Sequence, residues 1–253
     1  MEQWTWIAAS CRGVSHERTG LRCQDARNCS LLGEKADILF AVVSDGAGSA
    51  SHGGEGASLT CRVLTVNARK NFYKTLSLPS DDKIVAWVNA VKNSIISAAS
   101  RRNLLPRDFA ATLVCVISSG TDTVVAHVGD GCAVIKMAEY DQWIATSWPN
   151  QGEYASTTFF VTDDNGPKLR ITRCVAELSA CAVFTDGIER LALDFRSKVP
   201  FEPFLRTLIN PVITSKVRGR DSVLSDKLKN YLNSDLVNAR TDDDKTLILA
   251  ARK

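Results

Sequence analysis

The chain alternates between short apolar runs and polar breaks, and two long segments of helical periodicity interrupt this alternation in its first half. The short runs are rich in β-branched and aromatic residues, which is typical of strands. They stand in blocks, one of which opens the chain and one of which closes it. We therefore predict strands at residues 4–11, 26–32, 37–44, 109–118, 123–129, 132–138, 142–148, 157–162, 168–174, 180–185 and 245–251.

Two helices are predicted at residues 54–74 and 81–104, where apolar residues recur at helical spacing. In the second segment Ser80 or Asp81 is a suitable N-cap. A further helical region is predicted at residues 200–234. Strands in blocks, helices in pairs and a strand at each end favour an α+β fold with stacked sheets over alternating βαβ units.

Size and composition allow one large domain. The chain has 253 residues, 45% of them hydrophobic, and no Pro-, Gly- or Ser-rich stretch that would serve as a linker. We therefore treat residues 1–253 as a single domain and expect a monomer.

The charge pattern excludes several classes of partner. Thirty-one basic and 28 acidic residues give a net charge of +3, without a basic stripe, so we expect no nucleic-acid partner. No apolar run approaches the length of a membrane span, and the N-terminus has an acid where a signal peptide has bases. We expect no membrane partner and a cytoplasmic location.

Eight cysteines are spread along the chain without a C-x-x-C motif. None stands at zinc-ligand spacing with the three histidines, His16, His52 and His127. Several lie inside apolar strands, so we expect reduced thiols that act as small buried apolar side chains.

The candidate chemistry lies where the strands end. Three apolar runs break off at Asp-Gly, at Asp45, Asp130 and Asp186. Asp25 precedes another strand, and residues 242–244, all aspartate, precede the last one. Carboxylates gathered at one sheet edge repel each other and require cations. Oxygen ligands select Mg²⁺ or Mn²⁺, and two such ions sharing a carboxylate activate water and polarise a phosphoryl group.

Simpler explanations exist for some of these positions. Asp130 stands between two strands, where Asp-Gly is also a good two-residue hairpin. The aspartate run 242–244 is equally compatible with a solvated loop. No hairpin explains Asp45 or Asp186, because the residues after them are not strand-like. The repetition of a strand followed by Asp therefore favours a site.

The segments beside the acids carry further candidates. The glycine-rich stretch 46–54 lacks both a Walker lysine and the G-x-G-x-x-G pattern, so nucleotide binding is not predicted. His52 in this stretch is either a general acid or a solvated loop residue. Arg18 and Arg22 stand shortly before Asp25; they suit a phosphate dianion, or are ordinary surface charges.

Six motifs in order carry a resemblance: "RTGLRCQDA", "VVSDGAGSASHGGEGAS", "FAATLVCVI", "VGDG", "FTDGIE" and "DDDKTLIL". Together they resemble the PP2C-type (PPM) metal-dependent protein serine/threonine phosphatases, most of all the short bacterial branch. The match runs from about residue 8 to residue 250. It implies a PP2C-like α-β-β-α sandwich, two stacked antiparallel sheets flanked by helix pairs, with a two-metal site at one end.

The resemblance implies roles for single residues. Asp45 matches the carboxylate that bridges both ions, and Gly46 matches the residue whose carbonyl helps to bind the second ion. Asp186 and Asp243 match the remaining ligands of the first ion. Two Mn²⁺ or Mg²⁺ ions are therefore implied as cofactors, and these residues are the expected catalytic centre.

Two more acids match positions of the family. Asp25 matches the acid that supports the ligands from behind, and Asp130 matches the one that helps to hold a weaker third ion in some members. The family's phosphate-binding Arg falls at Gly20, so Arg22 or Arg18 is the candidate for that role.

Some positions depart from the family. Gln24 stands where the family has an acid, and Ala47 stands where some members have a histidine. The general acid is therefore not assigned, and residues 139–175 match no usual flap.

The implied function is a phosphomonoesterase that removes phosphate from phosphoserine and phosphothreonine in proteins, by attack of a metal-bridging water. Phosphorylated proteins are then its partners. Two alternatives remain: a catalytically weak phosphatase-like binding or regulatory module, and a phosphatase of small phosphorylated metabolites. The presence of Asp45, Asp186 and Asp243 together argues against the first.

Overall fold

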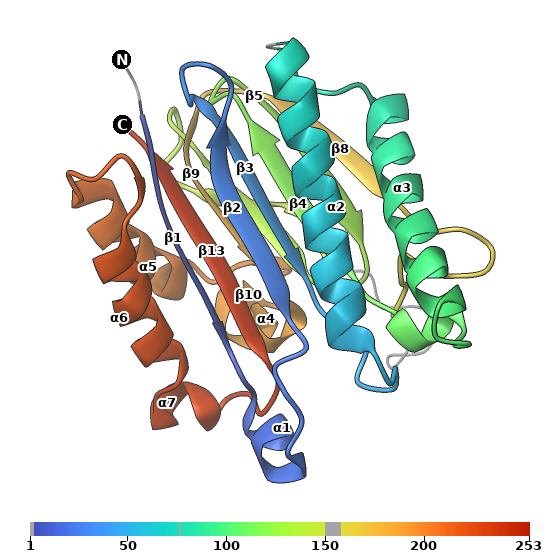
Figure 1. Cartoon of the computed structure of the whole chain (residues 1–253). Coiled ribbons are helices and arrows are strands. Elements are labelled where there is room, and N and C mark those ends of the chain that lie inside the picture. Colours follow the sequence, from blue (N-terminus) through green and yellow to red (C-terminus); the bar gives the residue numbers. More distant parts are fainter. Residues whose placement is uncertain (1–2, 76, 150–157) are drawn as a thin grey trace.

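The computed structural model describes residues 3–75, 77–149 and 158–253, which form two stacked β-sheets with helices on both outer faces (Figure 1). The predicted α+β sandwich is confirmed. One sheet has six strands, in the order β12 (Gly219–Arg220), β1 (Trp4–Cys11), β13 (Lys245–Arg252), β9 (Leu178–Phe184), β6 (Cys132–Met137) and β7 (Trp143–Ser147). The other has five, in the order β2 (Ala26–Leu32), β3 (Ile38–Ser44), β4 (Leu113–Ser118), β5 (Asp122–Val128) and β8 (Arg170–Val175).

The strand pairs of both sheets are antiparallel except for the short β12, which runs parallel to β1. The strands β3, β4, β9 and β13 are buried along almost their whole length, because each has a neighbouring layer on both faces. Continuous apolar runs are the sequence signal of such doubly covered strands.

Helix pairs cover the outer faces. Helices α2 (Gly53–Lys74) and α3 (Asp81–Ser100) pack on the five-stranded sheet, and α5 (Glu202–Thr214) and α6 (Ser222–Leu232) pack on the six-stranded sheet (Figure 1). The shorter elements are α1 (Val14–Thr19), η1 (Pro106–Phe109), η2 (Asp186–Ile188), α4 (Glu189–Ala192), β10 (Leu193–Asp194), β11 (Val199–Pro200) and α7 (Asp235–Asn238).

Local chemistry explains where the main helices begin. The Ser80 hydroxyl accepts a hydrogen bond from the Lys83 N–H at the start of α3, as the sequence predicts for an N-cap. The Asp221 carboxylate accepts from the Leu224 N–H at the start of α6 in the same way. Both caps satisfy N–H groups that have no partner inside the helix.

Apolar side chains fill three separate layers. One lies between α2, α3 and the five-stranded sheet, the second between the two sheets, and the third between the six-stranded sheet and the helices α5 and α6. Six of the eight cysteines are buried, whereas Cys23 and Cys174 are partly exposed, and all eight are free thiols. Within the part of the chain that the structure describes, no helix has both the length and the apolarity to cross a membrane.

Two strand predictions are wrong. Residues 158–162 form a loop and turn, although the Val161 side chain is fully buried. The Val161 N–H donates a hydrogen bond to the Ala111 carbonyl, but these residues do not continue as a strand. The predicted hairpin at Asp130 is also wrong, because β5 and β6 belong to different sheets. Asp130 therefore lies on a crossover between the sheets. Residue 157, the start of the first prediction, lies outside the described residues.

Some boundaries also differ. The helix predicted to reach residue 104 ends at Ser100, and the strand predicted from residue 109 begins at Leu113, after the short η1. The helical region 200–234 is two helices separated by β12. Helix α1 is not predicted, because none of its residues is buried and it therefore has no apolar period.

The chain ends lie together at one end of the sandwich. The backbones of Gln3 and Lys253 exchange hydrogen bonds of 2.6 and 3.0 Å. Strands β1 and β13 run from there to the opposite end, where α1 projects (Figure 1). The aspartate run 242–244 lies at that opposite end because β13 starts at Lys245.

Candidate metal and phosphate site

Four predicted acids lie at the end of the sandwich that carries α1. Asp45 follows β3, Asp186 follows β9, Asp243 precedes β13 and Asp25 precedes β2. Strands β9 and β13 are neighbours, and two hydrogen bonds join Thr185 and Thr246 at their junction, at 3.2 and 3.1 Å. The two sheets thus deliver carboxylates from both layers to one place.

The loop that carries Asp45 is fixed on both sides. The Asp45 N–H donates to the Thr112 hydroxyl at 2.9 Å, and the Thr112 N–H donates to the Asp45 carbonyl at 2.8 Å. Gly46 donates its N–H to the Gln24 carbonyl, and a Cβ at Gly46 would lie 2.1 Å from the Gly53 backbone. Only glycine fits there, so the Asp-Gly pair can turn tightly against the start of α2.

The pKa of the Asp45 carboxyl is strongly raised. Burial raises the pKa of its carboxyl well above the usual range, and the negative charges of Asp25, Asp186 and Asp243 raise it further. The Asp25 and Asp45 carboxyls are close enough to share a hydrogen bond. The charges of three other acids therefore act on the Asp45 carboxyl, which a nearby cation would favour in its ionised form.

Asp25 lies directly behind this group. Burial raises its pKa to about 7, although hydroxyl hydrogen bonds from Thr246 and Thr185 favour the ionised form. The Thr185 hydroxyl lies 2.8 Å from Asp25 Oδ2. Asp25 is therefore held by Thr246 in β13 and by Thr185, which directly follows β9.

Asp186 links the cluster to Asp130. Burial raises the pKa of Asp186 well above its usual value, and the charges of Asp130 and Asp243 add to this effect. One Asp130 oxygen accepts from the Thr158 hydroxyl, whereas Oδ1 is buried and has no partner among the described residues. Such a buried oxygen is free to accept a hydrogen bond from water or to contact an ion.

Asp243 stands at the edge of the cluster. Burial raises the pKa of Asp243, against a hydrogen bond from the Asp244 N–H to Oδ1 at 2.7 Å, which favours ionisation. Asp244 contributes a further negative charge and His16 an opposing effect.

These properties fit hard divalent ions. Burial first, and then the neighbouring acids, raise the pKa values of Asp25, Asp45 and Asp186, so a bound cation would stabilise their ionised forms, and oxygen donors suit Mg²⁺ or Mn²⁺. In residues 3–75, 77–149 and 158–253, no three His, Cys, Asp or Glu side chains converge enough to enclose an ion. An ion here would need carbonyl and water ligands as well, and Mg²⁺ usually keeps several waters.

The two arginines are placed differently from the acids. Arg18 ends up on α1 and Arg22 in the segment that follows it, and both are exposed. Neither makes a hydrogen bond or an ion pair with the described residues. They remain candidates for phosphate at the rim. His52 stacks on the Phe109 ring, with centroids 5.0 Å apart, and contacts the Ser51 hydroxyl at 2.9 Å.

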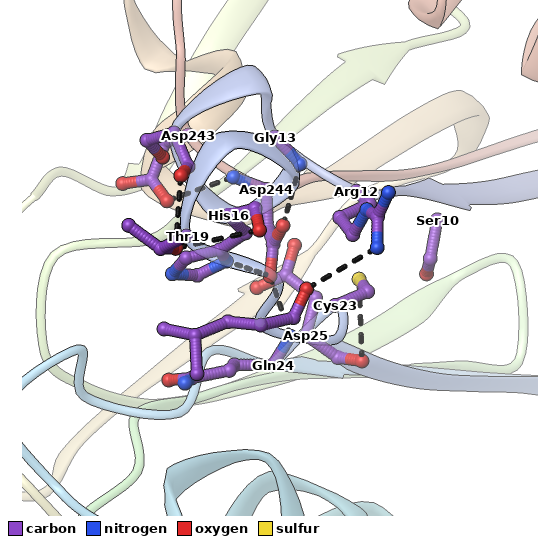
Figure 2. Close-up of polar contacts among 12 residues, drawn as sticks. Ser10, Arg12, Gly13, His16, Thr19, Cys23, Gln24, Asp25, Asp243 and Asp244 are labelled. Carbon is purple, nitrogen blue, oxygen red and sulfur yellow. Dashed lines mark hydrogen bonds and ion pairs between the residues drawn. The ribbon is translucent and has the colours of Figure 1, made fainter.

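The sequence assigns no individual role to three residues of this region, although one of them, Asp244, belongs to the candidate run 242–244. Asp244 is buried and accepts hydrogen bonds from Gly13 before α1 and from Gln24 after it, and His16 lies against it (Figure 2). Glu189 follows shortly after Asp186. Burial, and then the charge of Asp130, raise the pKa of Glu189 to about 7. Only the position of Glu189 three residues after Asp186 could have indicated it.

Comparison with known proteins gives a consistent result. The family model described as protein phosphatase 2C matches residues 12–233. The chain is similar to serine/threonine-protein phosphatase 3 of Escherichia coli (strain K12), with 36% identity over 251 residues and 98% of each chain covered.

Solved structures show the same fold at low identity. PppA, a key regulatory component of T6SS in Pseudomonas aeruginosa, has a TM-score of 0.68 at 16% identity, with 100% of each chain covered. The catalytic domain of the serine/threonine protein phosphatase PstP, in complex with two manganese ions, has a TM-score of 0.64 at 13% identity, with 100% of this chain and 99% of that chain covered. Stp1 from Staphylococcus aureus has a TM-score of 0.62 at 16% identity, with 97% of this chain and 94% of that chain covered.

Proposed function

The chain belongs to the protein phosphatase 2C family and is a serine/threonine protein phosphatase, and from this premise we propose how its own residues carry the reaction. The substrates are phosphoserine and phosphothreonine side chains of proteins, and the products are the free hydroxyl and inorganic phosphate. The observation that carries this proposal is the buried group of acids at Asp45, whose negative charges raise one another's pKa values.

Each acid would bind a different part of the two-metal site. Asp45 would contact both ions, the Gly46 carbonyl would contact the second, and Asp186 and Asp243 would complete the first. Two Mn²⁺ or Mg²⁺ ions, when bound, would lower the pKa of a water and draw charge from the phosphoryl group. Asp130 is the candidate for a weaker third position, supported by its unpartnered buried oxygen.

The surrounding groups hold these ligands in place. Thr112, directly before β4, fixes the Asp45 backbone, and Thr185, directly after β9, fixes the Asp25 carboxylate. Asp25 stands next to Asp45, where its negative charge and hydrogen bond can orient the bridging carboxylate. Such preorganisation reduces the rearrangement needed when charge develops on the phosphoryl oxygens.

The exposed arginines in and after α1 bind the substrate. Arg22 or Arg18 binds the phosphate dianion, because a guanidinium offers paired donors to phosphate oxygens. Both side chains are exposed and make no ion pair within the described residues, so they can reach a substrate without first breaking a contact.

The proposal also covers the domain organisation, the oligomeric state and the location of the protein. We treat residues 1–253 as one catalytic domain that acts as a monomer. A cytoplasmic location is supported by eight free thiols, which suit a reducing compartment.

Phosphate release from matched substrates tests the function. We expect release in Mn²⁺ from phosphoserine and phosphothreonine peptides, and much less from a phosphotyrosine peptide and from small phosphorylated metabolites. Preference for the metabolites would replace the protein substrate with a small one. Binding of phosphopeptides without release would indicate a phosphatase-like binding module.

A further inference from the structure

Asp244 has a buried carboxylate that the proposed reaction does not use. Its exposed fraction is 1%, and both of its oxygens are occupied. Oδ1 accepts from the Gly13 N–H at 2.6 Å, and Oδ2 accepts from the Gln24 N–H (Figure 2). The His16 Nδ1 atom lies 3.0 Å from Oδ2.

These contacts bracket one segment of the chain. Gly13 and Gln24 stand at the two ends of a stretch that contains α1, Arg18 and Arg22. One carboxylate therefore ties both ends of the arginine-bearing segment to the start of β13. The Asp244 backbone N–H bonds to the neighbouring Asp243 carboxylate at 2.7 Å, so the same residue also contacts a candidate metal ligand.

The segment has little else to fix its position. None of the residues of α1 is buried, so apolar packing does not hold this helix. Ser15 adds two bonds to the Asp242 carbonyl, from its N–H at 2.9 Å and its hydroxyl at 2.7 Å. The Gly13 backbone packs directly against residues 242–244: a Cβ at this position would come within 2.3 Å of the Asp243 backbone. Polar contacts to residues 242–244 are thus the main ties of α1, beside the exposed contacts of Arg12 with the Leu21 carbonyl and with Glu17.

We propose that Asp244 is a positioning residue, which sets the place of Arg18 and Arg22 relative to Asp243 and so the affinity for the substrate phosphate. The inference rests on the proposed function, since it concerns how that site receives its substrate. It predicts that loss of the Asp244 contacts acts on KM and only through the arginines.

Asparagine at position 244 is the sharpest perturbation. It keeps the shape of aspartate but replaces one acceptor oxygen by an NH₂ group, which is a donor. Whichever way the amide turns, the N–H of Gly13 or of Gln24 then faces a donor and loses its bond. Asp242→Asn is the matched control, since it removes the same charge on the other side of Asp243 from an exposed side chain.

The test measures kcat and KM on a phosphothreonine peptide in saturating Mn²⁺. We expect Asp244→Asn to raise KM ~tenfold, which corresponds to about 1.4 kcal/mol, with kcat changed less than ~threefold. Asp242→Asn should keep KM near the wild-type value. In a chain that carries Arg18→Ala and Arg22→Ala, Asp244→Asn should cause no further rise in KM, because coupled residues are not additive.

Three results would overturn the inference: an equal KM effect of Asp242→Asn, the same KM penalty in the chain without the two arginines, or a loss confined to kcat and the Mn²⁺ requirement. If Asp244→Asn fails to fold in a melting experiment, His16→Leu replaces it, with an expected ~threefold rise in KM that also vanishes without the arginines. Persistence of that rise would refute the positioning role.

Activity of the wild-type chain is measured first. A wild-type chain without phosphatase activity would refute the proposed function. The same variants would then be compared for binding of inorganic phosphate by calorimetry, where the same loss of affinity through the arginines is expected and its absence refutes the positioning role.

Discussion

Asp25→Asn should stabilise the metal-free protein at neutral and alkaline pH. Burial raises the pKa of Asp25 from an ordinary 3.8 to about 7. A carboxyl whose pKa is raised in the folded state contributes its full stability below the unfolded value, and this contribution is lost as the pH rises through the folded value. The metal-free wild-type chain should therefore lose stability between about pH 4 and pH 8.

The size of the effect follows from the same pKa values. Ionising Asp25 in the fold costs about 4 kcal/mol at pH 8, at about 1.36 kcal/mol for each pH unit between 3.8 and about 7. Asparagine avoids this cost but weakens the bond from the Thr185 hydroxyl, at about 1 kcal/mol. A net gain of about 3 kcal/mol corresponds to a melting temperature about 6–12 °C higher.

Thermal melts in EDTA at pH 5 and pH 8 measure this difference. The variant should melt well above the wild type at pH 8, and the gap should narrow at pH 5, where Asp25 is largely protonated in the fold. Saturating Mn²⁺ should also narrow the gap, because cations neutralise the cluster. Parallel melting of the two proteins from pH 5 to pH 8 in EDTA would refute the conclusion that burial raises the pKa of Asp25.

Three further substitutions test single residues of the site. Asp45→Asn should lower kcat at least ~10³-fold, about 4 kcal/mol, with a melt no lower than wild type; a tenth of wild-type activity would exclude Asp45 as the bridge. Asp130→Ala should raise the Mn²⁺ concentration needed for half-maximal activity or lower turnover, and an unchanged Mn²⁺ titration would leave Asp130 a structural role only. Arg22→Ala should raise KM more than it lowers kcat, with Arg18→Ala as the test of the alternative. Unchanged kinetics in both single variants and in the double variant would leave the phosphate-binding role without an arginine.

The strands that carry the acids could be predicted because their apolar runs are long and end abruptly. Asp45 and Asp186 follow β3 and β9, which are buried on both faces. Continuous apolar runs, however, do not indicate which strands pair with each other. Strands β5 and β6 are both apolar along most of their length, so no alternation distinguishes a hairpin at Asp130 from the observed crossover between sheets.

Other features leave no trace in the sequence pattern. Residues 242–244 are identical in type, and only the structure separates the exposed Asp242 from the buried Asp244. The run at 157–162 is apolar because Val161 fills the core from a loop, without a strand partner. A short apolar run that is buried in a loop has the same sequence pattern as a short strand. The contacts that bury it come from residues far away in the chain.

The acids around Asp45 are expected to act through divalent ions. Hydrolysis of a phosphothreonine peptide, measured in excess EDTA and then after addition of Mn²⁺, tests it most directly, with Asp45→Asn and Asp242→Asn as paired variants. The wild type and Asp242→Asn should be nearly inert in EDTA and regain activity with Mn²⁺, whereas Asp45→Asn should stay inactive. Full activity of the wild type in excess chelator would contradict the account.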